Sequence, residues 1–244
     1  MKAAPRRGLA KLLRLLALLL LVILALQLYF VARIGLMGVL DPQSTTFQRS
    51  EMRRILGEQG RLAWSQAWQP MSRISANLPR AVIASEDGGF TEHHGIEWDA
   101  VEQAWNRNQR AEARAVRRGR PPKVVGGSTI SQQLAKNLFL SGERRIARKA
   151  QEAVITLALE ALLPKSRILE IYLNHVEWGE GVFGAQAAAR HYFRVDAAQL
   201  GRAQAARLAV MLPAPKRFEK LPASAYLAAR SSAILARMGD VELP

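Results

Sequence analysis

The chain has 244 residues, a formal net charge of +15 and no cysteine. The lack of cysteine excludes disulfide bonds, thiolate catalysis and cysteine-ligated zinc. The excess of positive charge predicts attraction to anionic partners, and charge alone does not choose among phospholipid head groups, pyrophosphate and nucleic acid. The length is that of about one ordinary domain behind an N-terminal segment.

The N-terminal segment predicts a membrane anchor. Residues 15–32 are free of charge and rich in leucine, with Gln27 as a tolerable polar residue, and such a run is long enough to cross a bilayer core as a helix. No A-x-A-like site follows it, so an uncleaved anchor is favoured over a signal peptide. We expect a cytoplasmic N-terminus at 1–14 and an anchor at 15–40, with the rest of the chain outside, because basic residues precede the run: Lys2, Arg6, Arg7, Lys11 and Arg14.

Residues 41–69 are expected to form a membrane-proximal linker with helical pieces. Asp41 and Pro42 end the anchor helix, and Trp64 and Trp68 belong either to a membrane interface or to the core. The remaining residues, 70–244, show no run of alternating strands. We therefore predict one mainly α domain over 70–244.

An acidic pair marks the most informative stretch, residues 80–98. Val82 and Ile83 indicate the buried end of a helix, which places Glu86 and Asp87 at the junction with Gly88 and a second glycine. Desolvation at such a site raises the pKa of a carboxylate, which can then accept a proton from a sugar hydroxyl. The alternative is a capping residue with a salt bridge.

Two segments of contrasting composition follow. Residues 98–108 predict a helix with Val101, Ala104 and Trp105 on one face. Residues 107–123 are rich in arginine, poor in apolar residues and end in Pro121-Pro122, which predicts a mobile loop. A solvated run of charges is the alternative explanation.

The stretch GGSTISQQLAKN at residues 126–137 predicts another helix, with Ser128 as its N-cap. Its buried stripe is expected at every fourth position, at Ile130, Leu134 and Leu138. Exposed N–H groups at the helix start, beside a lysine, would suit a phosphate. Polar side chains share the other face: Thr129, Gln133, Lys136 and Asn137.

Residues 143–163 predict a long helix that Pro164 stops. Several cations crowd Glu152, since Arg144 and Arg148 precede it at four-residue intervals and Lys149 reaches the same carboxylate. A leaving pyrophosphate would need such cations, whereas an exposed ion pair would not. The expected core side of this helix contains Ile146, Ala150, Val154, Leu157 and Ala161.

Residues 166–176 predict a further helix, in which Glu170 and Asn174 lie together with a structural role. Its inward side is expected to contain Ile168, Leu169, Tyr172, Leu173 and Val176. A tight loop then follows at Gly179, Gly181 and Gly184.

Four ordered stretches resemble the signatures of the bacterial peptidoglycan glycosyltransferases, which polymerise lipid II into glycan strands. They are Glu86-Asp87 with Phe90, His93 and Gly95; residues 126–137; RKAQE at 148–152; and ILEIYLN at 168–174 followed by the glycine-punctuated residues 181–193. Four signatures in order form a far stronger signal than one short motif. The resemblance covers roughly residues 70–215.

The resemblance implies a lysozyme-like α fold and an inverting transferase that releases polyprenyl pyrophosphate. Glu86 would be the general base toward the acceptor sugar's 4-hydroxyl, and Glu152 would orient groups near the donor pyrophosphate. Lys136, Arg144 and Arg148 would contact phosphate. The other expected substrate-binding residues are Asp87, Phe90, His93, Gly127, Ser128, Thr129, Gln133, Asn137 and Lys149.

The resemblance implies no required cofactor and no metal-binding residues of the protein's own, and it allows Mg²⁺ or Mn²⁺ at the donor pyrophosphate. The expected partners are lipid II, the growing lipid-linked strand, membrane phospholipids and other cell-wall synthesis proteins, without nucleic acid. The expected location is the bacterial inner membrane with a periplasmic catalytic domain. No serine is followed three residues later by lysine, so we expect glycan polymerisation without peptide cross-linking.

Two other classes of protein stay open. A membrane-anchored, lysozyme-like hydrolase would use Glu86 as an acid, but it gives no reason for cations around Glu152. A non-enzymatic basic scaffold gives no reason for a carboxylate at a glycine-flanked helix end. Nucleic-acid binding lacks stacking aromatics in the arginine-rich segment and conflicts with the expected topology.

Overall fold

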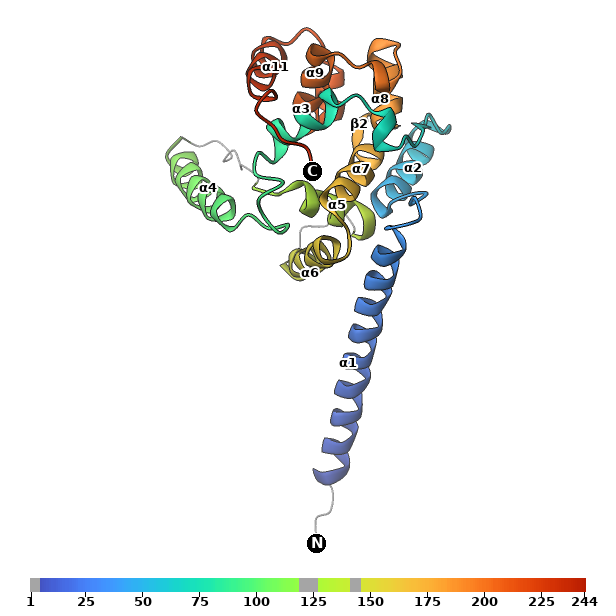
Figure 1. The fold of residues 1–244 in the computed structure, drawn as a ribbon. Coiled ribbons are helices and arrows are strands. Elements are labelled where there is room, and N and C mark those ends of the chain that lie inside the picture. Colours follow the sequence, from blue (N-terminus) through green and yellow to red (C-terminus); the bar gives the residue numbers. More distant parts are fainter. Residues whose placement is uncertain (1–4, 119–126, 141–145) are drawn as a thin grey trace.

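The computed structural model describes residues 5–118, 127–140 and 146–244. A single long helix, α1 (Pro5–Leu36), projects from a helical body (Figure 1). Among the described residues, its portion Gly8–Leu36 is the one stretch long and apolar enough to cross a membrane. Its leucines are exposed rather than packed on the body, which agrees with the expected anchor.

The body is mainly α, as predicted. Its helices are α2 (Thr46–Gln59), α3 (Asn77–Glu86), α4 (Trp98–Arg118), α5 (Ile130–Phe139), α6 (Ile146–Leu162), α7 (Lys165–His175), α8 (Ala185–Phe193), α9 (Arg202–Met211), α10 (Pro215–Glu219) and α11 (Ala225–Arg237). Single 3₁₀ turns occur at Met71–Arg73 and Ala197–Gln199. Three short strands form a sheet of order β1-β3-β2: β1 (Ser65–Gln66), β2 (Glu177–Gly179) and β3 (Val182–Phe183), with β1 parallel and β2 antiparallel to β3.

Two packed groups of helices build the body. At the top of Figure 1, α3 packs against α9 and α11, while α5 packs against α2, α6 and α7 nearer to α1. The predicted stripe of α5 is confirmed, since Ile130, Leu134 and Leu138 are buried. The predicted inward residues of α7 are all buried as well. Asn174 and Glu170 hold the segment before the first 3₁₀ turn, where they accept hydrogen bonds from the backbone N–H groups of Gln69 and Met71 respectively.

Residues 41–69, expected to be a linker, contribute α2 and β1 to the body. Thr45 caps α2 through a reciprocal pair of hydrogen bonds with Gln48. The ring of Trp64 stacks on Phe183 with 4.4 Å between centroids. This segment is therefore fixed by the same core that holds the site.

The loop prediction for residues 107–123 is wrong at 107–118, because α4 continues to Arg118. Residues 119–126, which include both prolines, lie outside the described residues. Arginine, alanine, glutamine and glutamate are good helix formers, so a scarcity of apolar residues indicated weak packing rather than the lack of a helix. Of the face predicted for this helix, Ala104 is buried, while Val101 and Trp105 are exposed.

The core side predicted for α6 is also wrong. Val154 and Leu157 are 50% and 52% exposed, and Ala150 and Ala161 are exposed beside them. Ile155 and Leu159 face the core instead, with Thr156 and Glu152 buried on the same side. The side chain of Ile146 lies outside the described part. Apolar residues occupy more than one face of this helix, so helical spacing alone did not identify the face that packs.

Gly184 provides a test of the backbone that joins β3 to α8. Its φ is +82°, and an added Cβ would lie 2.6 Å from the carbonyl oxygen of Asn174. We expect Gly184→Ala to destabilise the body by more than the roughly 1–2 kcal/mol of left-handed strain, because a steric clash is added. Thermal unfolding in detergent, followed by circular dichroism, checks this.

The matched control is Gly57→Ala within α2, where an added Cβ meets nothing within 4 Å. This variant should gain about 0.4–1 kcal/mol, because alanine restricts the unfolded chain more than glycine does. Equal stability of the two variants would contradict this account of Gly184.

Candidate functional site

The acidic turn is held by the carboxylate of Asp87, the residue directly after α3. Its Oδ2 accepts a hydrogen bond from the backbone N–H of Ile130, at 2.9 Å, and its Oδ1 lies 2.8 Å from Nε2 of His93. Nδ1 of His93 accepts a hydrogen bond from the N–H of Gly95. The ring proton of the neutral imidazole is therefore on Nε2, which donates a hydrogen bond to Asp87. Asp87 thus joins the turn to the start of α5.

The N-cap of α5 is Thr129, which corrects the assignment to Ser128 by one residue. Oγ1 of Thr129 accepts from the N–H of Gln132 at 3.1 Å and donates to the carbonyl of Gly95 at 2.6 Å. Oε1 of Gln132 accepts a hydrogen bond from the backbone N–H of Thr129, which completes a capping box. Gly95 has a φ of +86°, and an added Cβ would lie 2.7 Å from Glu160, so this position requires glycine.

The start of α5 is therefore not a free phosphate cradle, contrary to the expectation. The N–H of Ile130 is taken by Asp87 and that of Gln132 by Thr129. A carboxylate of the protein already occupies the place where the helix dipole favours an anion. The cationic side chains lie elsewhere: Lys136 further along α5, and Arg148 and Lys149 on α6, line the larger cavity described below.

Glu86 lies half-buried at the end of α3. Gln133 donates from Nε2 to Glu86 Oε2 at 3.1 Å, and Ser85 donates to Oε1 at 3.3 Å. The hydroxyl of Tyr172 donates to Oε1 of Gln133 at 3.0 Å, which fixes the orientation of that amide. Burial raises the pKa of the Glu86 carboxyl, against the opposing effects of the two hydrogen bonds and the positive charge of Arg230. A carboxylate whose pKa is raised is a stronger base than an ordinary glutamate.

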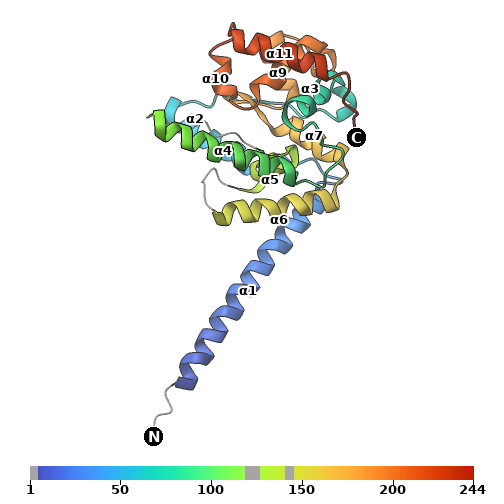
Figure 2. The ribbon, with the colours of Figure 1, turned by 90° about the vertical axis from the view of Figure 1, so that its left-hand side faces the viewer.

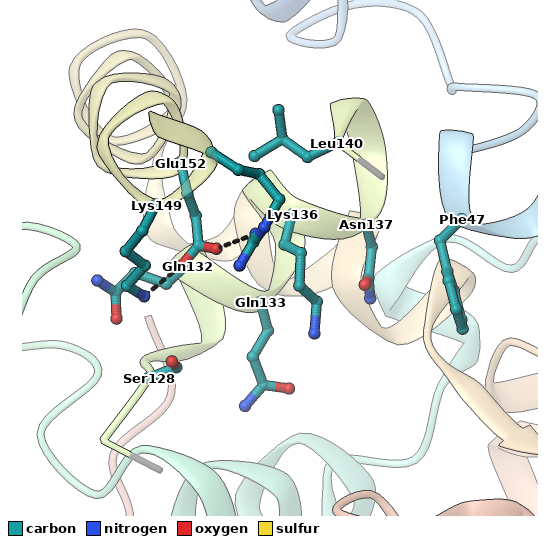
Figure 3. A pocket seen from close by; sticks show the side chains of 10 residues that line it. Phe47, Ser128, Gln132, Gln133, Lys136, Asn137, Leu140, Lys149 and Glu152 are labelled. Atoms are coloured by element: carbon teal, nitrogen blue, oxygen red, sulfur yellow. Dashed lines mark hydrogen bonds and ion pairs between the residues drawn. The ribbon is translucent and has the colours of Figure 1, made fainter. Parts of the chain in front are cut away.

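A cavity of about 350 Å³ lies between α5 and α6 (Figure 3). Glu152, only 4% exposed by side chain, accepts ion pairs from Arg148 at 2.8 Å and Lys149 at 2.5 Å. Lys136 points into the same cavity from α5 (Figure 3). Lys136 is exposed as a residue, yet partial burial lowers the pKa of its ammonium group. The negative charge of Glu152 opposes this shift, while the positive charges of Arg148 and Lys149 add to it. Three cations against one carboxylate favour an anionic ligand.

A second, smaller cavity of about 160 Å³ lies beside Glu86. Glu86 and Asp87 line it together with Gly127, Ser128 and Thr129. Ser128 also lines the larger cavity, and Gln133 reaches from the larger cavity to bond Glu86. The two cavities are therefore neighbours, with the carboxyl group of Glu86 at one and cationic side chains at the other.

Most of the residues predicted for the site line one of these two cavities. Asn137 lines the larger one, whereas Phe90 is fully buried beneath Lys165, whose Nζ lies 4.5 Å from the ring centroid. His93 supports Asp87 as described above, and Arg144 lies outside the described residues.

Sequence reasoning missed several lining residues. Phe47, Gln132 and Leu140 line the larger cavity, and Glu97, Ala104 and Arg107 line the smaller. Gln132 has a readable signal, because it stands three residues after Thr129 in a capping box. Phe47 has no such signal in the sequence, since only the tertiary packing of α2 on α5 brings its side chain to the cavity.

Asp87, His93 and Glu97 place potential metal ligands within 4.8 Å of one another. The lone pair of His93 is used at Nδ1 and its proton faces Asp87, so this group is satisfied by hydrogen bonds and does not fit a cation. Each oxygen of Glu152 is already held by a cationic side chain. The carboxylates of Asp87 and Glu152 are therefore already held by partners within the protein.

Comparison with known proteins now defines the class. Residues 53–239 match the family model described as Transglycosylase, and the chain belongs to this family. It is 52% identical over 224 residues to the biosynthetic peptidoglycan transglycosylase of Herminiimonas arsenicoxydans, covering 92% of this chain and 93% of that protein. It is 53% identical to the protein of the same name from Burkholderia thailandensis strain E264, over 91% of this chain and 83% of that one.

The cationic cavity predicts how pyrophosphate binds. Lys136→Ala and Arg148→Ala should each weaken binding of inorganic pyrophosphate by about tenfold or more, because a charge-assisted contact contributes roughly 1.5–3 kcal/mol. Equilibrium dialysis with labelled pyrophosphate measures the change. Lys220→Ala is the control, since Lys220 is exposed and lies outside both cavities. An equal loss in all three variants would indicate a general charge effect and contradict a defined pocket.

Proposed function

We propose that this protein polymerises the glycan strands of peptidoglycan from a lipid-linked disaccharide precursor, lipid II. The observation that carries the proposal is the pairing of a half-buried base, Glu86, with the adjoining cationic cavity around Glu152. Membership of the transglycosylase family supports the reaction class. The names of relatives about half identical to this chain support peptidoglycan as the product.

The chemical step follows from the two cavities. The acceptor sugar lies with its 4-hydroxyl against Glu86, and the donor pyrophosphate lies among Lys136, Arg148 and Lys149. The acceptor oxygen attacks the anomeric carbon of the donor while its proton passes to Glu86. The bond from that carbon to the pyrophosphate oxygen breaks on the opposite side, so the configuration inverts and polyprenyl pyrophosphate leaves.

The leaving group explains why one base suffices. Pyrophosphate departs as an anion without a strong general acid, so cations replace the second carboxyl that glycoside hydrolysis uses. Glu152 has the role of orienting those cations, because it binds Arg148 and Lys149 directly. Gln133 and Ser128 lie between the two substrates and are placed to contact both sugars.

Glu86→Gln tests the base. The variant preserves shape but cannot accept a proton, so polymer formation should fall by about 10²–10⁴-fold while binding of lipid II survives. The wild-type rate should also fall as pH decreases through the raised pKa of Glu86, because protonation removes the base.

Gln133→Met should move this fall in rate to higher pH, since the substitution removes a hydrogen bond that favours the charged carboxylate of Glu86. Gel analysis of polymer from labelled lipid II across pH measures both effects.

The same gels discriminate against a hydrolase. A transferase needs lipid-linked donor and leaves mature glycan intact, whereas a hydrolase shortens preformed strands and creates reducing ends. Shortening of mature glycan without polymer from lipid II would overturn the proposal. Full polymerisation by Glu86→Gln, with an unchanged pH profile, would remove Glu86 from the chemistry.

We also propose that the protein lies in the bacterial inner membrane, with the body in the periplasm beside phospholipids, the growing lipid-linked strand and other cell-wall synthesis proteins. The basic residues before the charge-free run of residues 15–32 and the exposed leucines along α1 support this orientation. The sequence lacks cysteine, so single-cysteine variants report topology without background.

In spheroplasts, a membrane-impermeant maleimide should label Lys220→Cys at once, because this position would face outward. It should label Lys2→Cys only after lysis. The reverse pattern would contradict both the orientation and an external substrate.

A further inference from the structure

A reciprocal pair of amides joins the membrane helix to the catalytic body. Nε2 of Gln27 donates to Oε1 of Gln151, and Nε2 of Gln151 donates to Oε1 of Gln27, both at 3.0 Å. Gln27 lies inside the charge-free run of residues 15–32, where its amide is the one such group. Gln151 lies on α6, immediately before Glu152 of the cationic cavity.

A second attachment lies just beyond the end of α1. There Arg167 of α7 donates to the carbonyl oxygens of Met37 and Leu40 at 2.8 and 3.1 Å, and to the carboxylate of Asp41 at 2.7 Å. Gln27 and Met37 are ten residues apart, which is about 15 Å along a helix. Two attachments at this spacing fix both the direction of α1 and its rotation relative to the body.

Apolar side chains fill the space between the attachments. Phe30, Ile34 and Met37 are buried, and the ring of Phe30 meets the edge of Phe139 on α5 at 5.2 Å. Gln27, Phe30 and Ile34 recur at intervals of three and four, so they form one face of α1, and Met37 follows directly after the helix end. Apolar packing tolerates small rotations and shifts, whereas a doubly hydrogen-bonded amide pair does not, because a shift of one residue turns the helix by about 100°.

The Gln27–Gln151 pair also fixes the level of α6 along the membrane-spanning part of α1. Gln27 lies five residues before the end of the apolar run, which is about 8 Å along the helix axis. Helix α6 packs across α1 at this level (Figure 2). Its outward side is apolar, with Val154 and Leu157 about half exposed, so it suits contact with the acyl layer. The cations beside Glu152 are thereby held close to the head-group plane.

We propose that the Gln27–Gln151 pair is a positioning device that holds the cationic cavity at one height and orientation above the bilayer, so that the pyrophosphate of a membrane-bound donor meets it. This proposal rests on the proposed function. The two glutamines do not touch substrate, and they act through the placement of α6.

The kinetic test compares Gln27→Leu, Gln151→Leu and the double variant in proteoliposomes with long-chain lipid II. Each should raise the apparent KM for the donor about three- to tenfold while kcat stays within twofold, because binding geometry changes and the chemistry does not. With a short-chain, water-soluble donor in detergent, the variants should match wild type. Leu28→Ala is the control, since Leu28 neighbours Gln27 but is 68% exposed.

The outcomes separate the proposal from simpler explanations. A double variant that returns to the wild-type KM would show only that an unpaired amide is harmful, and it would overturn the proposal. An equal defect with the soluble donor would indicate damage to the fold, with the same consequence. Joining Gln27→Cys to Gln151→Cys with a short bis-maleimide should restore the wild-type KM, and failure to do so would count against a positioning role.

The depth of α6 in the bilayer can be measured without enzyme activity, so this test is independent of the test of the proposed function. A fluorophore on Val154→Cys should be quenched by lipids brominated near the head group, and Gln27→Leu should shift or broaden that depth profile. An unchanged profile would overturn the proposal even if the enzyme is active. If the depth profile shifts but the protein makes no polymer, the positioning role of the Gln27–Gln151 pair would be supported and the proposed polymerase function refuted.

Discussion

The buried carboxylate of Asp87 is the interaction on which the site depends. It binds the first N–H of α5 on one side and the protonated nitrogen of His93 on the other, so it connects the end of α3, the turn and the start of α5. Its side chain is 1% exposed, and a buried charge is tolerated only when such partners surround it. The helix dipole of α5 adds to the stabilisation. Once this connection is made, Glu86 at the end of α3 and Gln133 on α5 meet without further adjustment.

Two adjacent carboxylates therefore have different roles because their surroundings differ. Asp87 is satisfied by strong donors and serves the architecture, while Glu86 receives only two neutral hydrogen bonds within a partly dry cavity. The negative charge of Asp87 further raises the pKa of Glu86, so the structural residue also tunes its neighbour. The two interpretations of the acidic pair thus apply to different residues: Asp87 caps the start of α5 and pairs with His93, while Glu86 stays half-buried beside the smaller cavity.

The sequence predicted correctly those helices in which the pattern of apolar and polar residues allows only one buried face. The buried stripe of α5 and the inward side of α7 were predictable because polar residues occupy the opposite faces. The side on which α6 packs was not predictable, because Val154 and Ile155 are equally apolar and only the tertiary packing of α6 against α5, α1 and α7 distinguishes them. The N-cap of α5 was readable after all, since Thr129 and not Ser128 has a glutamine three residues later. The contribution of Phe47 to the larger cavity required the tertiary packing of α2.

The three environments of α6 explain its unusual composition. Ile155 and Leu159 face the core, Glu152 with its cations faces the larger cavity, and Val154 with Leu157 faces away from the protein. A helix that served a soluble substrate would have no reason to place an exposed apolar side within two residues of a cationic pocket, because that side costs free energy in water. A lipid-linked pyrophosphate presents both requirements at once, with charge at the head-group plane and hydrocarbon below it. The composition that misled the prediction of the core is thus the one expected from the proposed place of α6 between membrane and substrate.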